Sequence, residues 1–161
     1  MFSIFKTHPL YFKISEALLH DSKNCFVSGL SGSSSAFMIS NIYESSEKHI
    51  ICILPEKEEA ANFYSDLISI LNDSEVLFFP SSFRKKYNAS DINTANSVIR
   101  TRALEIISSS EKPLLIVTYP EAITEKAVNR EILSENTLIL HKGEKVSTSF
   151  KIGRASCRER V

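Results

Sequence analysis

The chain has 161 residues, with 19 basic and 19 acidic side chains, so its formal net charge is zero. This balance gives no electrostatic case for nucleic-acid binding across the whole chain. A hydrophobic content of 43% excludes a disordered class and predicts a globular domain with a core. No apolar run has the length that spans a bilayer, and the N-terminal residues lack the pattern of a signal peptide.

Two of the three cysteines, Cys25 and Cys52, fall within apolar runs, and no C-x-x-C spacing is present. We expect both to be buried, reduced thiols in strands. Together with the missing secretory and membrane signals, this predicts a cytoplasmic location and no membrane partner.

The first half of the chain alternates helical apolar spacing with short continuous apolar runs. We predict, in order, a helix over 9–20, a strand over 24–28, a helix over 33–44, a strand over 50–54 and a helix over 56–71. The run at 50–54 is closed by a proline and is typical of a strand buried on both faces of a parallel sheet.

The second half continues the alternation with a strand over 76–79, a helix over 92–108 and a strand over 114–118. A short helix starting at Pro120 and a mostly helical stretch over 125–133 follow. The next apolar run is at 137–140. The buried side of the helix at 92–108 is predicted to carry Ile92, Ala95, Ile99, Ala103, Ile106 and Ile107. The order predicts an α/β class with a three-layer, mainly parallel sheet.

A glycine–serine loop within Asn24–Ser40 lies between a β-prone run and an apolar segment. Strand, glycine loop and helix is the order of phosphate-binding loops, where backbone N–H groups face an anion. Aligning Gly29 with the first glycine of G-x-x-x-x-G-K-[ST] puts Ser34 at the second glycine. The lysine position then falls on Ser35, and the Mg²⁺-binding hydroxyl position falls on Ala36.

The loop therefore has the order of a phosphate loop without its lysine cation and its metal-binding hydroxyl. We interpret it as vestigial and expect no catalytic residue, no metal and no nucleotide cofactor there. The alternative is an ordinary Ser/Gly turn that caps a helix. The residues of the vestigial loop are Gly29, Gly32, Ser33, Ser34, Ser35 and Ala36.

Three consecutive basic residues, Arg84, Lys85 and Lys86, lie between aromatic residues in a predicted loop. Basic and aromatic side chains in such a mixture can contact phosphates or stack on bases, so a weak phosphate or DNA contact is one interpretation. The other is a solvated loop, because the run is much shorter than a basic tract. The four histidines are scattered without metal-ligand spacing, and we find no catalytic constellation.

The last ten residues, Ile152–Val161, read IGRASCRERV and contain three arginines. Their back-translation resembles a common short-read sequencing adapter, so we interpret them as a non-native tail and expect the natural protein to continue beyond about residue 150. Three Arg and one Glu carry a net charge of +2, so the chain without this tail has a net charge of 0 − 2 = −2. Cys157 lies in the tail and has no functional meaning in this interpretation.

Six ordered segments resemble the N-terminal region of bacterial transcription-repair coupling factors, the Mfd family, which is itself similar to the excision-repair protein UvrB. They are GLSGSSSAFM at 29–38, ICILPEKEEAANFYSDLISIL at 51–71, VLFFPSSFRKKY at 76–87, VIRTRALEII at 98–107, LLIVTYPEAITEK at 114–126 and LILHKGEKVS at 138–147. The form FFPSSFRK resembles the Bacteroidetes branch. UvrB has an intact Gly-Lys-Thr in its loop, whereas coupling factors are similarly degenerate to this chain.

The resemblance implies a UvrB-like domain 1a with a degenerate P-loop of RecA/helicase-like fold over 1–136. It also implies a truncated start of the UvrA-interaction domain over 137–151, before the tail at 152–161. The family's full-length proteins are ATP-dependent DNA translocases that displace stalled RNA polymerase and recruit nucleotide excision repair. Their ATP and Mg sites, and their contacts to UvrA, RNA polymerase and double-stranded DNA, are implied to lie mostly outside this chain. The alternatives are an active small P-loop NTPase or kinase, and the N-terminal domain of another helicase or UvrB-like protein.

Overall fold

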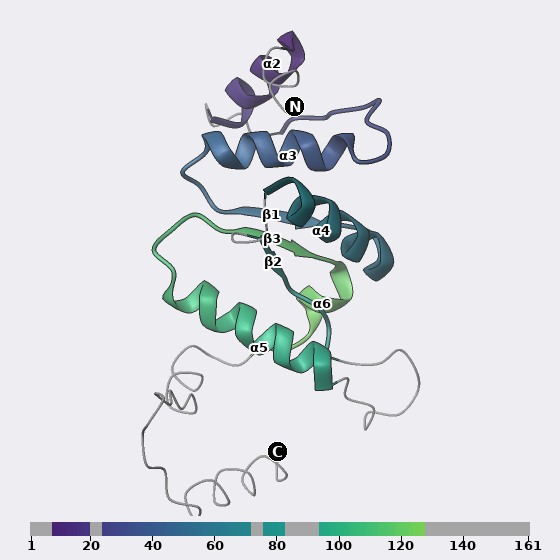
Figure 1. Cartoon of the computed structure of the whole chain (residues 1–161), viewed down its shortest axis with the longest axis vertical. Coiled ribbons are helices and arrows are strands. Elements are labelled where there is room, and N and C mark those ends of the chain that lie inside the picture. Colours follow the sequence, from purple (N-terminus) through teal and green to yellow (C-terminus); the bar gives the residue numbers. More distant parts are fainter. Residues whose placement is uncertain (1–7, 20–23, 72–75, 83–93, 128–161) are drawn as a thin grey trace, which may run out of the picture. The chain divides into compact units, whose positions relative to one another are not determined.

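The structure, a computed structural model, describes residues 8–19, 24–71, 76–82 and 94–127. The chain divides into two units, Met1–Ala127 and Val128–Val161, and all described residues belong to the first. These residues form five helices and three strands that alternate along most of the chain (Figure 1). The elements are α2 (Pro9–Leu19), α3 (Ser34–Ser45), β1 (Ile50–Ile53), α4 (Lys57–Leu71), β2 (Val76–Phe78), α5 (Thr94–Ser109), β3 (Leu115–Thr118) and α6 (Pro120–Thr124).

The described strands form one parallel sheet in the order β1-β3-β2. In register, Leu115 of β3 lies between Ile50 of β1 and Val76 of β2. All four residues of β3 are buried, as expected for a central parallel strand with both faces covered. The predicted α/β class with a parallel sheet is therefore confirmed for the described residues.

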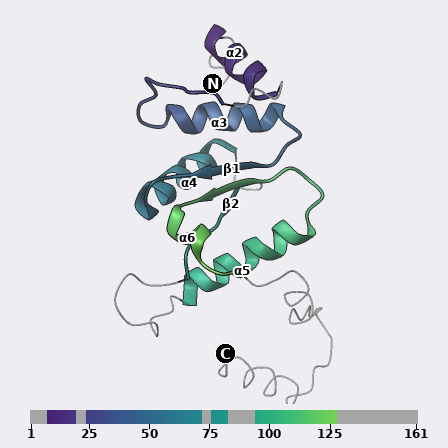
Figure 2. The same cartoon turned by 180° about the vertical axis from the view of Figure 1, so that it is seen from behind.

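Helix α4 packs against β2 and β3, and α3 packs against α4. The inner face of α4 carries Ala60 and Leu67, which are buried, and Tyr64, which stacks on Phe78 with ring centroids 5.2 Å apart. Helix α5 contacts β2 from another direction, as the two opposite views show (Figures 1 and 2). The core therefore lies between the sheet and α4, with α3 closing one side.

Strand β1 does not have the two buried faces predicted for the run at 50–54. Ile51 is 60% exposed and Ile53 is 58% exposed, whereas Cys52 between them is buried, as predicted. Burial raises the pKa of the Cys52 thiol to about 11. The reason for the difference is position: β1 is at one end of the sheet order, and the described helices leave one of its faces uncovered.

The predicted strand at 24–28 is wrong, because the structure has no strand there. Phe26 is 94% exposed, and Cys25 is exposed rather than buried. Residues with β propensity form a strand only where a neighbouring strand takes up their backbone groups, and propensity alone is a weak determinant. This segment has no such neighbour among the described residues.

The buried face of α5 differs from the prediction. Ala103 is buried, but Ile99 and Ile107 are 43% and 39% exposed, and Ala95 is also exposed. Arg100 takes the inner position instead, with only 5% of its surface exposed. An apolar pattern cannot identify a helix face whose central residue is charged. The predicted residue Ile92 lies outside the described residues.

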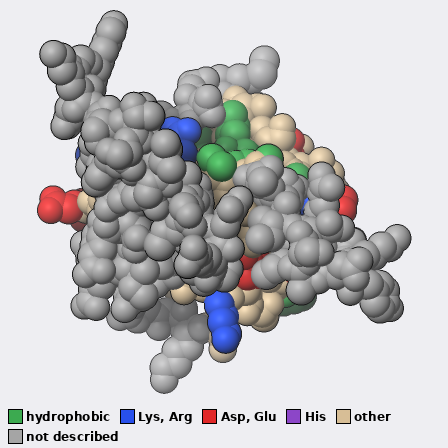
Figure 3. All heavy atoms as spheres, turned by 90° about the horizontal axis from the view of Figure 1, so that it is seen from below, with side chains coloured by type: hydrophobic (Ala, Val, Ile, Leu, Met, Phe, Trp, Pro, Cys, Tyr) green, Lys and Arg blue, Asp and Glu red, His purple; other side chains and the backbone are tan. Residues whose placement is uncertain are grey.

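Several hydrophobic side chains of the described residues reach the surface, as a space-filling view illustrates (Figure 3).

The short helix predicted at Pro120 is confirmed, with the proline in its first turn. The helical stretch predicted from residue 125 is wrong for 125–127, where the chain is not helical, and its remainder lies outside the described residues. Among the described helices, none is both long and apolar enough to cross a membrane.

Candidate functional site

The glycine–serine loop before α3 has two residues in the left-handed backbone region. Gly29 has a φ of 83° and Gly32 a φ of 55°. An added Cβ would meet no atom within 4 Å at either position, so the backbone conformation, and not lack of space, favours glycine. The loop thus depends on its two glycines for its path, although no strand precedes it.

The Ser34 side chain closes the loop on itself. Its hydroxyl accepts a hydrogen bond from the Ser31 N–H at 2.8 Å and donates one to the Ser31 carbonyl oxygen at 2.7 Å. The Ser34 N–H also points to that carbonyl, at 3.2 Å. Ser33, at the N-cap of α3, makes no capping bond through its side chain. Two backbone N–H groups of the loop, those of Ser31 and Ser34, are therefore already bonded to the chain itself.

Ala36, at the position where a phosphate loop has its metal-binding hydroxyl, is buried at 0% exposure in the hydrophobic core. Ser35, at the lysine position, is half-buried and carries no charge. Gly29, Gly32 and Ser33 are exposed. The six predicted residues are thus together in one turn, but the turn offers no side-chain cation and no oxygen at its metal position.

The second predicted site, Arg84, Lys85 and Lys86, lies outside the described residues. No group of three or more His, Cys, Asp or Glu side chains in the described ranges is placed to hold a metal ion.

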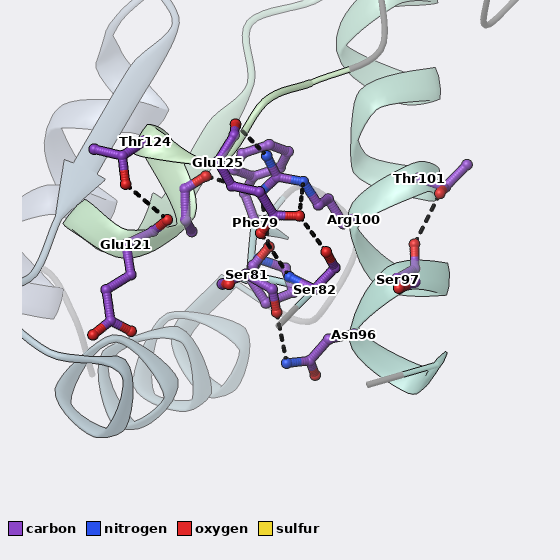
Figure 4. Close-up of polar contacts among 12 residues, drawn as sticks. Phe79, Ser81, Ser82, Asn96, Ser97, Arg100, Thr101, Glu121, Thr124 and Glu125 are labelled. Atoms are coloured by element: carbon purple, nitrogen blue, oxygen red, sulfur yellow. Dashed lines mark hydrogen bonds and ion pairs between the residues drawn. The ribbon is translucent and has the colours of Figure 1, made fainter. Parts of the chain in front are cut away.

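The strongest polar cluster of the described residues was missed by the sequence analysis and surrounds Arg100 (Figure 4). The guanidinium donates to the carbonyl oxygens of Pro80 and Ala122, each at 2.9 Å, and to that of Glu125 at 3.1 Å. It also lies over the Phe79 ring, with its carbon 4.1 Å from the ring centroid. A planar fork of donors is suited to several acceptors at once, which a lysine could not match.

Glu125 completes the charge balance of this cluster. Its carboxylate lies 3.7 Å from Arg100 Nε and accepts hydrogen bonds from the N–H of Ser82, at 2.8 Å, and from the Ser82 hydroxyl. Burial alone would raise the pKa of the Glu125 carboxyl. The hydrogen bonds from Ser82 and from the Ser81 side chain, together with the Arg100 charge, outweigh this, so the pKa lies below its ordinary value.

Further bonds attach the residues that follow β2 to their surroundings. The Ser81 N–H donates to the Tyr119 hydroxyl at 2.9 Å, and the Asn96 amide donates to the Ser81 carbonyl at 2.9 Å. Burial raises the pKa of Tyr119. Among the described residues, no buried side-chain nitrogen or oxygen lacks a hydrogen-bond partner.

The cluster lies just beyond the carboxyl ends of β2 and β3, the edge at which parallel α/β sheets usually bind ligands. Here the described polar groups at that edge bond to one another. Comparisons with protein-family models, curated proteins and solved structures find no match for this chain. Functional interpretation therefore depends on the residues themselves.

The low pKa of Glu125 predicts an acid-dependent contribution to stability. We expect Glu125→Gln to lower the free energy of unfolding by about 1–3 kcal/mol at neutral pH, because it removes a charged acceptor from two bonds. A carboxyl whose pKa is lower in the folded state than in the unfolded state stabilises the fold at pH values above its ordinary pKa of 4.5. This stabilisation is lost as the pH falls through the folded-state pKa. The difference between the variant and the wild type should therefore shrink in acid.

The measurement is urea unfolding of the full chain between neutral pH and acid. Glu111→Gln is the control, because Glu111 is an exposed carboxylate. If the difference in the free energy of unfolding between Glu125→Gln and the wild type stayed constant below pH 4.5, the lowered pKa of Glu125 would be contradicted.

Proposed function

We propose that this chain is a non-catalytic, UvrB-like N-terminal module of a transcription-repair coupling factor. In this proposal the finer fold is a degenerate P-loop NTPase domain of RecA/helicase type. The observation that carries the non-catalytic part is Ala36, a buried apolar side chain where a nucleotide site needs a hydroxyl. The ordered set of resembling segments supports the family.

The geometry of the loop supports the vestigial interpretation in two ways. Gly29 and Gly32 keep the left-handed backbone that tight phosphate loops require, while Ser34 bonds back to Ser31. A cation at position 35 would be needed to reach the β- and γ-phosphates, and Ser35 has none. The loop therefore retains part of the shape without the chemistry.

In this proposal the enzymatic activity belongs to the longer parent protein and not to this chain. ATP hydrolysis, DNA translocation, and contacts to RNA polymerase and double-stranded DNA would belong to other parts of the parent. Contact to UvrA would belong to the second domain, of which 137–151 is the proposed start.

We predict that the unmodified chain does not bind Mg·ATP at micromolar concentrations. The missing lysine removes a charge-assisted hydrogen bond of about 1.5–3 kcal/mol, which is roughly ten- to hundredfold in affinity. The missing metal anchor weakens binding further. Titration calorimetry is the measurement.

Ser35→Lys restores the cation and should raise the affinity, whereas Ser35→Gln is a control of similar length without charge. Ala36→Thr is unsuitable as a restoring change, because extra atoms at a fully buried position would strain the core. Micromolar binding by the wild type would overturn the vestigial interpretation and favour the alternative, an active small P-loop NTPase.

We also predict little retention of this chain by immobilised UvrA, because most of the proposed contact domain is missing. A longer natural chain that continues through the second domain should be retained under the same conditions. Strong retention of the 161-residue chain would place the contact in the first domain instead. Failure of the longer chain to bind would contradict the family proposal.

A further inference from the structure

Arg100 joins two segments that leave the same edge of the sheet. Pro80 follows β2, and Ala122 and Glu125 lie in and just after α6, more than forty residues later in the chain. The guanidinium donates to a carbonyl oxygen of each of these residues. In Figure 4 the two segments converge on the guanidinium, which extends from α5 toward Glu125.

The Glu125 carboxylate makes the connection direct. It bonds to both the N–H and the hydroxyl of Ser82 and pairs with Arg100. Both charged side chains are nearly buried, at 7% and 10% exposure. A buried ion pair that loses one member leaves an uncompensated charge, so removal of either member is costly.

The rest of the sheet has independent support. The backbone ladder continues past the strands through Leu54 N–H to Thr118 O and Phe79 N–H to Val117 O, each at 2.9 Å. The Ser81 backbone is held by Tyr119, which accepts from its N–H, and by Asn96, which donates to its carbonyl oxygen, whereas the Ser81 side chain also interacts with Glu125. Ser82 is therefore the described residue after β2 whose backbone N–H depends on Glu125.

We propose that Arg100 and Glu125 form a latch that couples the two segments, Pro80–Ser82 and Ala122–Glu125. When the Glu125 carboxylate is lost, the Ser82 N–H is released, while the Ser81 backbone keeps its bonds to Tyr119 and Asn96 and the sheet remains in place. The latch thus links the described residues that follow β2 to those that follow α6. A change on either segment is transmitted to the other, since coupling between two sites is reciprocal.

The titratable and charged groups that interact with Glu125 are Arg100, from α5, and Tyr119, at the start of α6. Arginine remains charged throughout the ordinary pH range, so the state of the latch is decided by the Glu125 carboxylate.

Amide hydrogen exchange by NMR on the full chain tests the latch. In Glu125→Ala, the Ser82 amide should exchange roughly ten- to hundredfold faster, the factor that corresponds to a hydrogen bond with a charged group. The amides of Ser81 and of β3 should keep their wild-type rates. Glu111→Ala, at an exposed carboxylate, is the matched control and should change none of them.

Ser82→Ala, which deletes only the hydroxyl bond, gives the reciprocal test. It should speed exchange of the Arg100 Nε–H while the sheet amides stay protected. An unchanged Ser82 amide in Glu125→Ala would overturn the proposal. An equal increase in the exchange rates of all amides would overturn it too. Glu125 would then stabilise the whole fold and not the contact between the two segments.

Discussion

The buried guanidinium of Arg100 is the constraint on which this edge of the molecule depends. A charge removed from water must regain its hydrogen bonds, or its burial costs several kcal/mol. Three carbonyl oxygens accept its hydrogen bonds, and one carboxylate balances its charge. They come from the residues after β2 and from the residues in and after α6, so those segments must adopt backbone paths that bring their oxygens together.

This constraint bears on the proposed function. The carboxyl edge of a parallel sheet is where a ligand would be expected, and here the side chains of Arg100, Glu125 and Tyr119 bond to the protein. The glycine–serine loop is likewise closed by Ser34 and followed by a buried Ala36. Both features are compatible with the non-catalytic module that we propose.

The sequence predicted most of the described helices and strands, because their apolar spacing is determined by burial against the sheet. It failed where the outcome depends on distant partners. The run at 24–28 has strand propensity but no neighbouring strand, and Ile51 faces a side of β1 that no described helix covers. Arg100 was missed because hydrophobic periodicity places charges outside, and its partners Pro80 and Glu125 lie at least twenty residues away in the chain. The cysteine prediction failed at Cys25 for the same reason as its strand.

The most direct test of this account is ¹⁵N–¹H NMR of the arginine side chains of the full chain. A guanidinium held by several acceptors cannot rotate freely, so Arg100 should give a separate, slowly exchanging Nε–H signal and resolved Nη signals at neutral pH. Arg102, exposed on the same helix, is the internal reference and should show averaged, rapidly exchanging signals. Averaged signals for Arg100 like those of Arg102 would contradict the claim that this residue organises the edge of the sheet.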